Sequence, residues 1–220
     1  MQGIVFDFNG TLLSDTAIHE VAWRQYIQSL LNRPITEEEF QQIHGRTNHL
    51  IMEKFLNKQL TSNEAERYSE EKEAVYRELL LQEETVELIQ GVTEFFDYLQ
   101  EKNVRMNIAT ASPKSNVDFY FDFFDLGRWF DLEKIVYNDG TLASKPAPDY
   151  YLQAAKNVGI TPEEMIVFED SPIGLQGAAN AKAKHVVAVA TNGNHDTLQE
   201  LDAVKVVIDD FMDPRLRELI

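Results

Sequence analysis

Ile4-Val5-Phe6-Asp7-Phe8-Asn9-Gly10-Thr11 sets the architecture of this chain. The apolar run at residues 4–6 predicts a short buried strand, and Asp7 follows it directly. Gly10 permits a tight turn whose backbone amides can face an anion. A carboxylate in this position suits nucleophilic attack on a phosphoryl group, although a plain turn after a strand is the alternative.

Beyond residue 91, short apolar runs alternate with helical patterns. The strand candidates are residues 104–109, 134–137, 165–168, 185–189 and 204–208. The helix candidates are residues 92–100, 114–124, 149–158 and 174–181, and Thr161-Pro162-Glu163-Glu164 has the form of a helix start. This alternation predicts an α/β fold with a doubly wound parallel sheet, whose site lies at the carboxyl ends of the strands.

Residues 15–86 have a different pattern, helical throughout and without a convincing strand. Apolar side chains recur at helical spacing between Ile18 and Leu30. Thr36-Glu37-Glu38-Glu39 has the form of a capping box, a further helix is expected near Thr47, and a long charged helix covers about 62–81. We therefore expect an α-helical bundle domain at 15–86, inserted after the first strand of a catalytic core made of 1–14 and 87–220.

Composition and charge restrict the partners of this protein. The chain has 37 acidic and 20 basic residues, and its formal net charge of -17 repels nucleic acid and anionic lipid. Cysteine is absent, which excludes disulfides and thiolate chemistry. No apolar run is long enough to cross a bilayer, and residues 1–3 leave no room for a secretion signal. We expect a cytoplasmic monomer that binds a small molecule, with neither nucleic acid nor a membrane as partner.

Polar clusters follow three further strand candidates. Thr110-Ala111-Ser112 offers a hydroxyl and backbone amides to a phosphate, or alternatively an N-cap. Lys145, in a turn stiffened by Pro146, can neutralise negative charge, or be an ordinary solvated lysine. Glu169-Asp170 ends another strand and, with Asp7, would form a hard oxygen site suited to Mg²⁺; a helix cap is the alternative. The order of all four clusters after successive strands favours one joint phosphate-binding site.

These four clusters resemble the motifs of the haloacid dehalogenase superfamily, in the branch with a helical cap inserted after the first motif. The phrases at 144–149 and 169–174 are most similar to the β-phosphoglucomutase-like subgroup, as are Asp15-Thr16, His19 and Trp23. The resemblance covers the full chain. It implies a Rossmann-like core with a cap, and a Mg²⁺-dependent phosphatase that acts on a small phosphorylated metabolite, such as a sugar phosphate, through an aspartyl-phosphate.

The resemblance also implies roles for individual residues. The catalytic residues are Asp7 as nucleophile, Asn9 at the proton-transfer position, and Lys145. The metal site is formed by Asp7, the backbone carbonyl of Asn9, Asp170 and, in support, Glu169. The phosphate is held by Thr110, Ala111, Ser112 and Lys145. The cap residues that read the substrate are His19, Gly45 and Arg46.

Asn9 departs from the family pattern. The family usually has a second aspartate here, which transfers a proton, and an amide cannot do so. General acid–base catalysis contributes about 10²–10⁴-fold to rates, so we expect activity that is weak, rerouted or absent. His19 is a candidate substitute base if the cap closes over the site, and a structural histidine otherwise.

The cap supplies two further expectations. Asn48 occupies the position where a mutase has a basic phosphate clamp, which disfavours the alternative of a β-phosphoglucomutase-type isomerase; Arg46 is a substitute clamp or a surface arginine. A catalytically impaired phosphate-binding or regulatory protein is the other alternative. Phosphonate cleavage would need a desolvated lysine in the cap, and the sequence indicates none.

Overall fold

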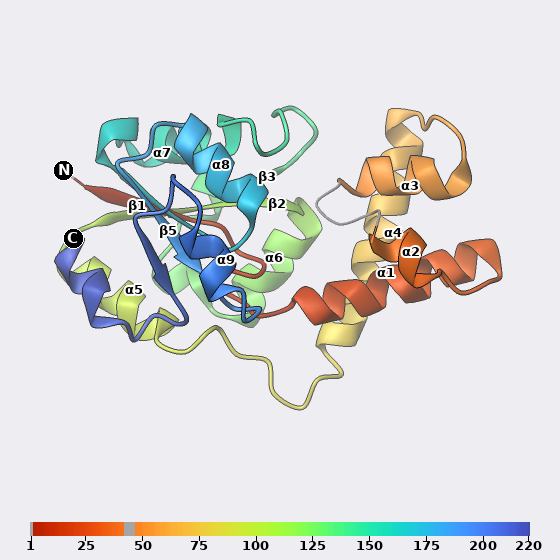
Figure 1. The fold of residues 1–220 in the computed structure, drawn as a ribbon, viewed down its shortest axis with the longest axis horizontal. Helices are drawn as coiled ribbons and strands as arrows, with labels where there is room; N and C mark the ends of the chain where they lie inside the picture. The colour runs from red at the N-terminus through yellow and green to blue at the C-terminus, as the bar shows by residue number, and fades with distance from the viewer. Residues whose placement is uncertain (1, 42–46) are drawn as a thin grey trace. The chain divides into compact units, whose positions relative to one another are not determined.

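The computed structural model describes residues 2–41 and 47–220 (Figure 1). It divides into two compact units: Met1–Ser14 with Glu87–Ile220, here called the sheet unit, and Asp15–Val86, here called the helical unit. Among the described residues, no helix combines the length and the apolar character needed to cross a membrane.

The sheet unit contains one six-stranded sheet in the order β3-β2-β1-β4-β5-β6, and all its strand pairs are parallel. The strands are β1 (Gly3–Phe6), β2 (Arg105–Pro113), β3 (Val136–Asn138), β4 (Met165–Glu169), β5 (His185–Val189) and β6 (Val206–Ile208). β1 lies at the centre, where Val5 pairs with Asn107 on one side and Val167 on the other. The predicted doubly wound parallel sheet is therefore confirmed.

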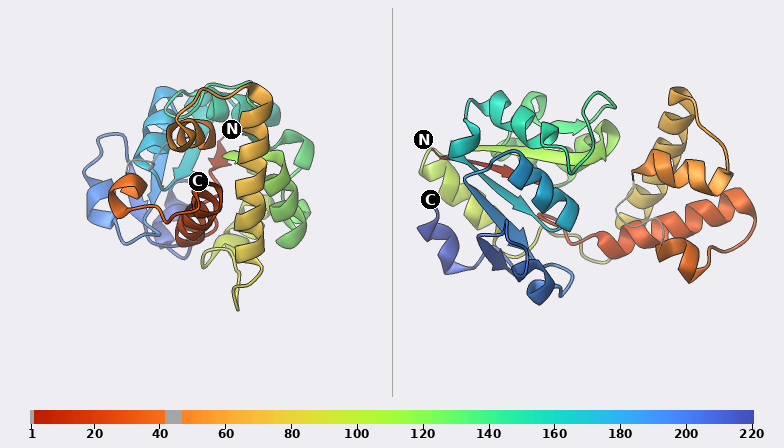
Figure 2. Two further views of the ribbon diagram at one scale, coloured as in Figure 1. Left: turned by 90° about the vertical axis from the view of Figure 1, so that its right-hand side faces the viewer. Right: turned by 45° about the horizontal axis from the view of Figure 1, so that its top comes forward.

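Helices cover both faces of this sheet, as Figures 1 and 2 show. The helices of the sheet unit are α5 (Val92–Glu101), α6 (Lys114–Phe123), α7 (Asp149–Val158), α8 (Pro172–Asn180) and α9 (His195–Gln199). Val5 and its neighbours on one face pack against α7 and α8. Phe6 points to the other face, where its ring meets those of Phe95 and Phe96 on α5. Burial on both faces explains why the strands are continuous apolar runs.

Two local predictions differ from the structure. Residues 161–164 form only a 3₁₀ turn (Pro162–Glu164), because the apolar run at 165–168 follows at once and pairs with β1. The backbone of β2 continues through Thr110-Ala111-Ser112 to Pro113, so this motif lies on a strand rather than at a helix start. Its irregular pairing with β3 carries it past the expected end at 109.

In its described residues, the helical unit contains four helices: α1 (Thr16–Leu31), α2 (Glu37–Gln41), α3 (Asn48–Leu56) and α4 (Ser62–Leu80). Their apolar faces enclose a separate core that includes Trp23, Ile27 and Met52. A capping box at Thr61 and Glu64 begins α4. The helical character of this segment was predictable from the helical spacing of apolar residues in α1 and from the capping-box pattern at Thr36.

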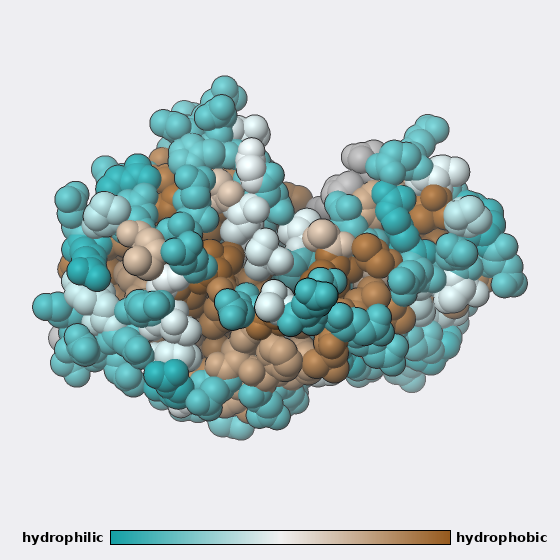
Figure 3. Space-filling model, turned by 90° about the horizontal axis from the view of Figure 1, so that it is seen from below, coloured by the Kyte–Doolittle hydropathy of each residue, from teal (hydrophilic) through white to brown (hydrophobic). Residues whose placement is uncertain are grey.

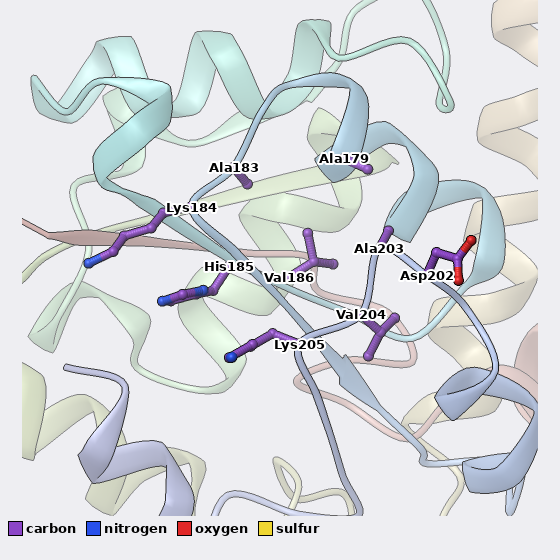
Figure 4. Close-up of a pocket in the computed structure, with 9 residues that line it drawn as sticks. All are labelled: Ala179, Ala183, Lys184, His185, Val186, Asp202, Ala203, Val204 and Lys205. Carbon is purple, nitrogen blue, oxygen red and sulfur yellow. The ribbon is translucent and has the colours of Figure 1, made fainter.

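The surface agrees with the composition. Hydrophilic side chains cover much of the face in Figure 3, with apolar residues between them. A pocket lined in part by Lys184, His185 and Lys205 lies where β5 and β6 begin (Figure 4). It is therefore at the amino ends of the strands, opposite to the ends that carry the polar motifs.

Candidate functional site

The four sequence motifs meet at the carboxyl ends of the central strands. Asp7 directly follows β1, and Glu169 is the last residue of the neighbouring strand β4. The backbone amide of Asp7 donates to the carbonyl of Phe168 at 2.9 Å, which extends the strand pairing to Asp7. Parallel pairing thus places residues that are far apart in sequence at one edge.

Three carboxylates and one lysine form the centre of the site. Each of Asp7, Glu169 and Asp170 has an oxygen within 4.8 Å of the others. Lys145 Nζ lies 2.6 Å from Asp7 Oδ1 and 3.4 Å from Glu169 Oε2. Burial lowers the pKa of Lys145, but the negative charges of Asp7 and Glu169 outweigh burial and hold this pKa well above its usual value. The two carboxylates therefore favour the charged form of this lysine.

Negative charge remains in excess around this lysine. Burial, followed by the charges of Glu169 and Asp7, raises the pKa of Asp170 well above its usual value. One ammonium group compensates the negative charges of three buried or half-buried carboxylates poorly. A hard divalent cation with oxygen ligands would remove this imbalance, and the donor set fits such an ion.

Two glycines allow the carboxylates to come this close. At Gly10, where φ is 82°, an added Cβ would lie 2.3 Å from Asp170 Oδ2. At Gly174 an added Cβ would lie 2.1 Å from the carboxyl carbon of Glu169. Both distances are far below a normal carbon contact, so the carboxylates occupy space that only glycine leaves open.

Several residues that the sequence reasoning had not assigned hold the carboxylates in place. The Tyr151 hydroxyl donates to Glu169 Oε2 at 3.2 Å, and the Ser171 hydroxyl donates to Glu169 Oε1 at 2.7 Å. Thr11 Oγ1 donates to Asp170 Oδ1 at 3.0 Å. Thr11 and Ser171 belong to quoted motifs, whereas Tyr151 has the spacing of an ordinary core residue of α7 and no sequence signal marked it.

Asn9 follows Asp7 by two residues, and its side chain contacts the second motif. Its Oδ1 accepts from the Ser112 hydroxyl at 2.7 Å and from Thr110 Oγ1 at 3.5 Å. Its Nδ2 donates to the hydroxyl of Tyr120 at 2.7 Å. The structure therefore brings Ser112 and Thr110 next to Asn9, while the side chain of Ala111 is exposed.

His19 belongs to the helical unit, where it joins a buried polar cluster. Its Nδ1 lies 2.8 Å from Lys72 Nζ, its Nε2 lies 3.4 Å from Asp15 Oδ2, and its ring stacks on Tyr76. Lys72 is only 1% exposed and lies 3.0 Å from Glu73 Oε1. Burial lowers the pKa of Lys72. The expectation that the cap contains no desolvated lysine is therefore wrong.

Of the remaining cap residues, the structure describes Asn48 but not Gly45 or Arg46. Asn48, at the expected clamp position, donates through Nδ2 to Ser69 Oγ at 2.9 Å and to Glu73 Oε1 at 2.8 Å. These contacts use its amide within the helical unit. Gly45 and Arg46 lie outside the described residues, so their roles stay predictions.

Comparisons with known proteins agree with this geometry. A family model described as a haloacid dehalogenase-like hydrolase matches residues 1–182. A phosphorylated carbohydrates phosphatase of Thermotoga maritima is 28% identical over 94% of both chains.

Two crystal structures resemble the fold. A HAD hydrolase of family IA, variant 3, from Entamoeba histolytica is 35% identical, covers 100% of this chain and 97% of its own, and superposes with a TM-score of 0.92. A β-phosphoglucomutase from Clostridium difficile, 20% identical with coverage of 100% and 96%, has a TM-score of 0.73 and supports the fold alone. With the match over residues 1–182 and the four motifs at one edge of the sheet, the chain belongs to the haloacid dehalogenase-like hydrolases.

Proposed function

We propose that this hydrolase is a Mg²⁺-dependent phosphatase of small phosphorylated metabolites, with phosphorylated carbohydrates as the first class to test. The observation that carries the proposal is the contact between Asp7 and Lys145 inside the cluster with Glu169 and Asp170. A nucleophilic carboxylate, a fixed cation and hard oxygen ligands are what phosphoryl transfer requires. The named activity of the T. maritima relative supports the substrate class.

In the proposed reaction, a carboxylate oxygen of Asp7 attacks phosphorus and the bond to the leaving oxygen breaks. Water then attacks the aspartyl-phosphate and regenerates Asp7. Lys145 holds the nucleophile and balances the phosphoryl charge, while backbone amides near Ala111 donate to phosphoryl oxygens. Mg²⁺, held by Asp7, Asp170 and the carbonyl of Asn9, would supply Lewis-acid charge neutralisation.

The test is phosphate release from a panel of sugar phosphates and other metabolites with Mg²⁺. We expect release that stops when the ion is chelated and that is lost in Asp7→Asn. Circular dichroism of Asp7→Asn checks that its fold is unchanged. Equal release by Asp7→Asn, or none by the unaltered protein from any panel member, contradicts the proposal.

A further inference from the structure

We propose that this site takes phosphoryl groups from donors whose leaving group is stable as an anion, namely acyl, enol and aryl phosphates, and that phosphorylated Asp7 then persists. The inference rests on the proposed role of Asp7 as nucleophile. It goes further, because it states which phosphate compounds react fast and which step is slow.

Two hydrogen bonds fix the orientation of the Asn9 side chain. Ser112 donates to its carbonyl oxygen at 2.7 Å, and its amide nitrogen donates to Tyr120 at 2.7 Å. Tyr120 is itself buried and its ring stacks on Phe8 at 4.3 Å between centroids. The side chain at the proton-transfer position is thus held at both ends, and it has no proton that it can give up or lone pair that can accept one near neutral pH.

The amide of Asn9 affects the departure of the leaving group. When Asp7 attacks, a new P–O bond to its carboxylate forms and the bond to the leaving oxygen breaks, with the electron pair staying on that oxygen. An alkoxide from a sugar needs a proton at this moment, and Asn9 cannot supply it. A carboxylate, enolate or phenolate leaves without one. Acyl, enol and aryl phosphates therefore react without the loss of rate that the amide of Asn9 causes for sugar phosphates.

The amide of Asn9 also affects hydrolysis of the aspartyl-phosphate. Water must form a P–O bond and lose a proton while the bond from phosphorus to Asp7 breaks and the carboxylate returns. Asn9 cannot accept that proton, so it must pass to solvent. Donors with an anionic leaving group phosphorylate Asp7 without a proton from residue 9, whereas hydrolysis of the aspartyl-phosphate is slowed by the lack of a proton acceptor there. The phosphorylated chain therefore accumulates.

His19, the candidate substitute base, is held by other contacts. Both ring nitrogens of His19 have partners within the helical unit, Lys72 and Asp15. In the sheet unit, the Asn9 amide nitrogen donates to the hydroxyl of Tyr120 at 2.7 Å. Tyr120 is thus a rival proton donor that the experiment has to include.

The experiment uses the whole chain with Mg²⁺ and four probes: acetyl phosphate, p-nitrophenyl phosphate, phenyl phosphate and glucose 6-phosphate. Rapid acid quench followed by intact-protein mass spectrometry measures the fraction of chains that carry a phosphoryl group, and phosphate release is followed in parallel. The same spectra verify that the Asn9 amide is intact. The variants are Asn9→Asp, Tyr120→Phe and, as the control that cannot be phosphorylated, Asp7→Asn.

We expect acetyl phosphate and p-nitrophenyl phosphate to phosphorylate most chains, and glucose 6-phosphate to react far more slowly. Asn9→Asp should raise turnover of glucose 6-phosphate by about 10²–10⁴-fold, the usual contribution of acid–base catalysis, and lower the phosphorylated fraction. Tyr120→Phe should leave the order of the four probes unchanged.

Four results would overturn the inference. Equal rates for glucose 6-phosphate and acetyl phosphate, with no gain in Asn9→Asp, would reject it while leaving the phosphatase function intact. A selective loss of glucose 6-phosphate turnover in Tyr120→Phe would assign the proton to Tyr120 instead. Phosphorylation of Asp7→Asn would place the phosphoryl group elsewhere. Absence of both phosphorylation and phosphate release with every probe would reject this inference and the proposed function together.

Discussion

Gly174 occupies a position on α8 where the carboxylate of Glu169 fills the space of a side chain. The Cβ of Gly174→Ala would lie 2.1 Å from the Glu169 carboxyl carbon, so this carboxylate has to move. We expect weaker Mg²⁺ binding and lower phosphate release, with little loss of stability because alanine favours a helix by about 1 kcal/mol over glycine.

The matched control for this change is Gly177→Ala on the same helix, where the nearest atom is 3.3 Å from the added Cβ. Titration with Mg²⁺ and assays of phosphate release would compare the two variants. Equal effects of both changes would contradict the assignment of Gly174 to the carboxylate site.

Lys72 and Glu73 form a pair inside the helical unit, with side chains 2% and 5% exposed. In Lys72→Met, the Glu73 carboxylate loses its nearest cation. Breaking a buried pair from one side costs about 3–5 kcal/mol, and we expect a loss of this order in the free energy of unfolding. Urea denaturation measures it.

The double variant Lys72→Met, Glu73→Gln separates charge from packing. It removes the uncompensated charge and should recover a large part of the stability lost in Lys72→Met. A double variant no more stable than the single one would show that packing of the lysine stem, rather than charge pairing, dominates.

At the scale of the helix, the start of α4 depends on the capping box at Thr61. Glu64 N donates to Thr61 Oγ1 at 3.4 Å, and Thr61 N donates to Glu64 Oε2 at 3.0 Å. Thr61→Ala removes the first bond, and we expect a loss of about 1 kcal/mol in the free energy of unfolding.

The control is Thr47→Ala, since Thr47 caps α3 without a side-chain hydrogen bond to its first turn. Thermal or urea unfolding should give a smaller loss for this variant. A loss as large as that of Thr61→Ala would mean that threonine at these positions acts through backbone preference, not through the cap bond.

For the whole molecule, stability should depend on the metal. Lys145 lies 2.6 Å from Asp7 in the cluster of Asp7, Glu169 and Asp170, and an ion that binds this cluster only in the folded state would add to the compensation and stabilise the fold. At about 100 times the dissociation constant the gain is about 2.7 kcal/mol. Calorimetry with and without Mg²⁺ would measure the shift in melting temperature.

Asp170→Asn is the informative variant for this shift. It removes a carboxylate whose pKa is raised by burial and by its acidic neighbours, so the ion-free protein should melt higher while the Mg²⁺-dependent shift shrinks. An undiminished shift would mean that the ion binds elsewhere.

Much of the architecture was predictable because its signals are local. The continuous apolar runs at β1, β4 and β5 marked strands that are buried on both faces. The helix start predicted at Thr161-Pro162-Glu163-Glu164 yields only a 3₁₀ turn because its signal is also local. The capping box is present, but the next residues pair with β1 and end the turn. Pairing with a distant strand outweighed the local preference.

The sequence by itself determined the order of strands and helices and the four motifs, since apolar period, caps and the residues after each strand are all read within a few positions. Only the tertiary structure decided that Tyr120 contacts Asn9, 111 positions away, that Tyr151 supports Glu169, and that Lys72 is buried on a helix rich in charge. These facts depend on which element packs against which, because a charged or aromatic side chain has no local pattern that reports what will face it in the fold.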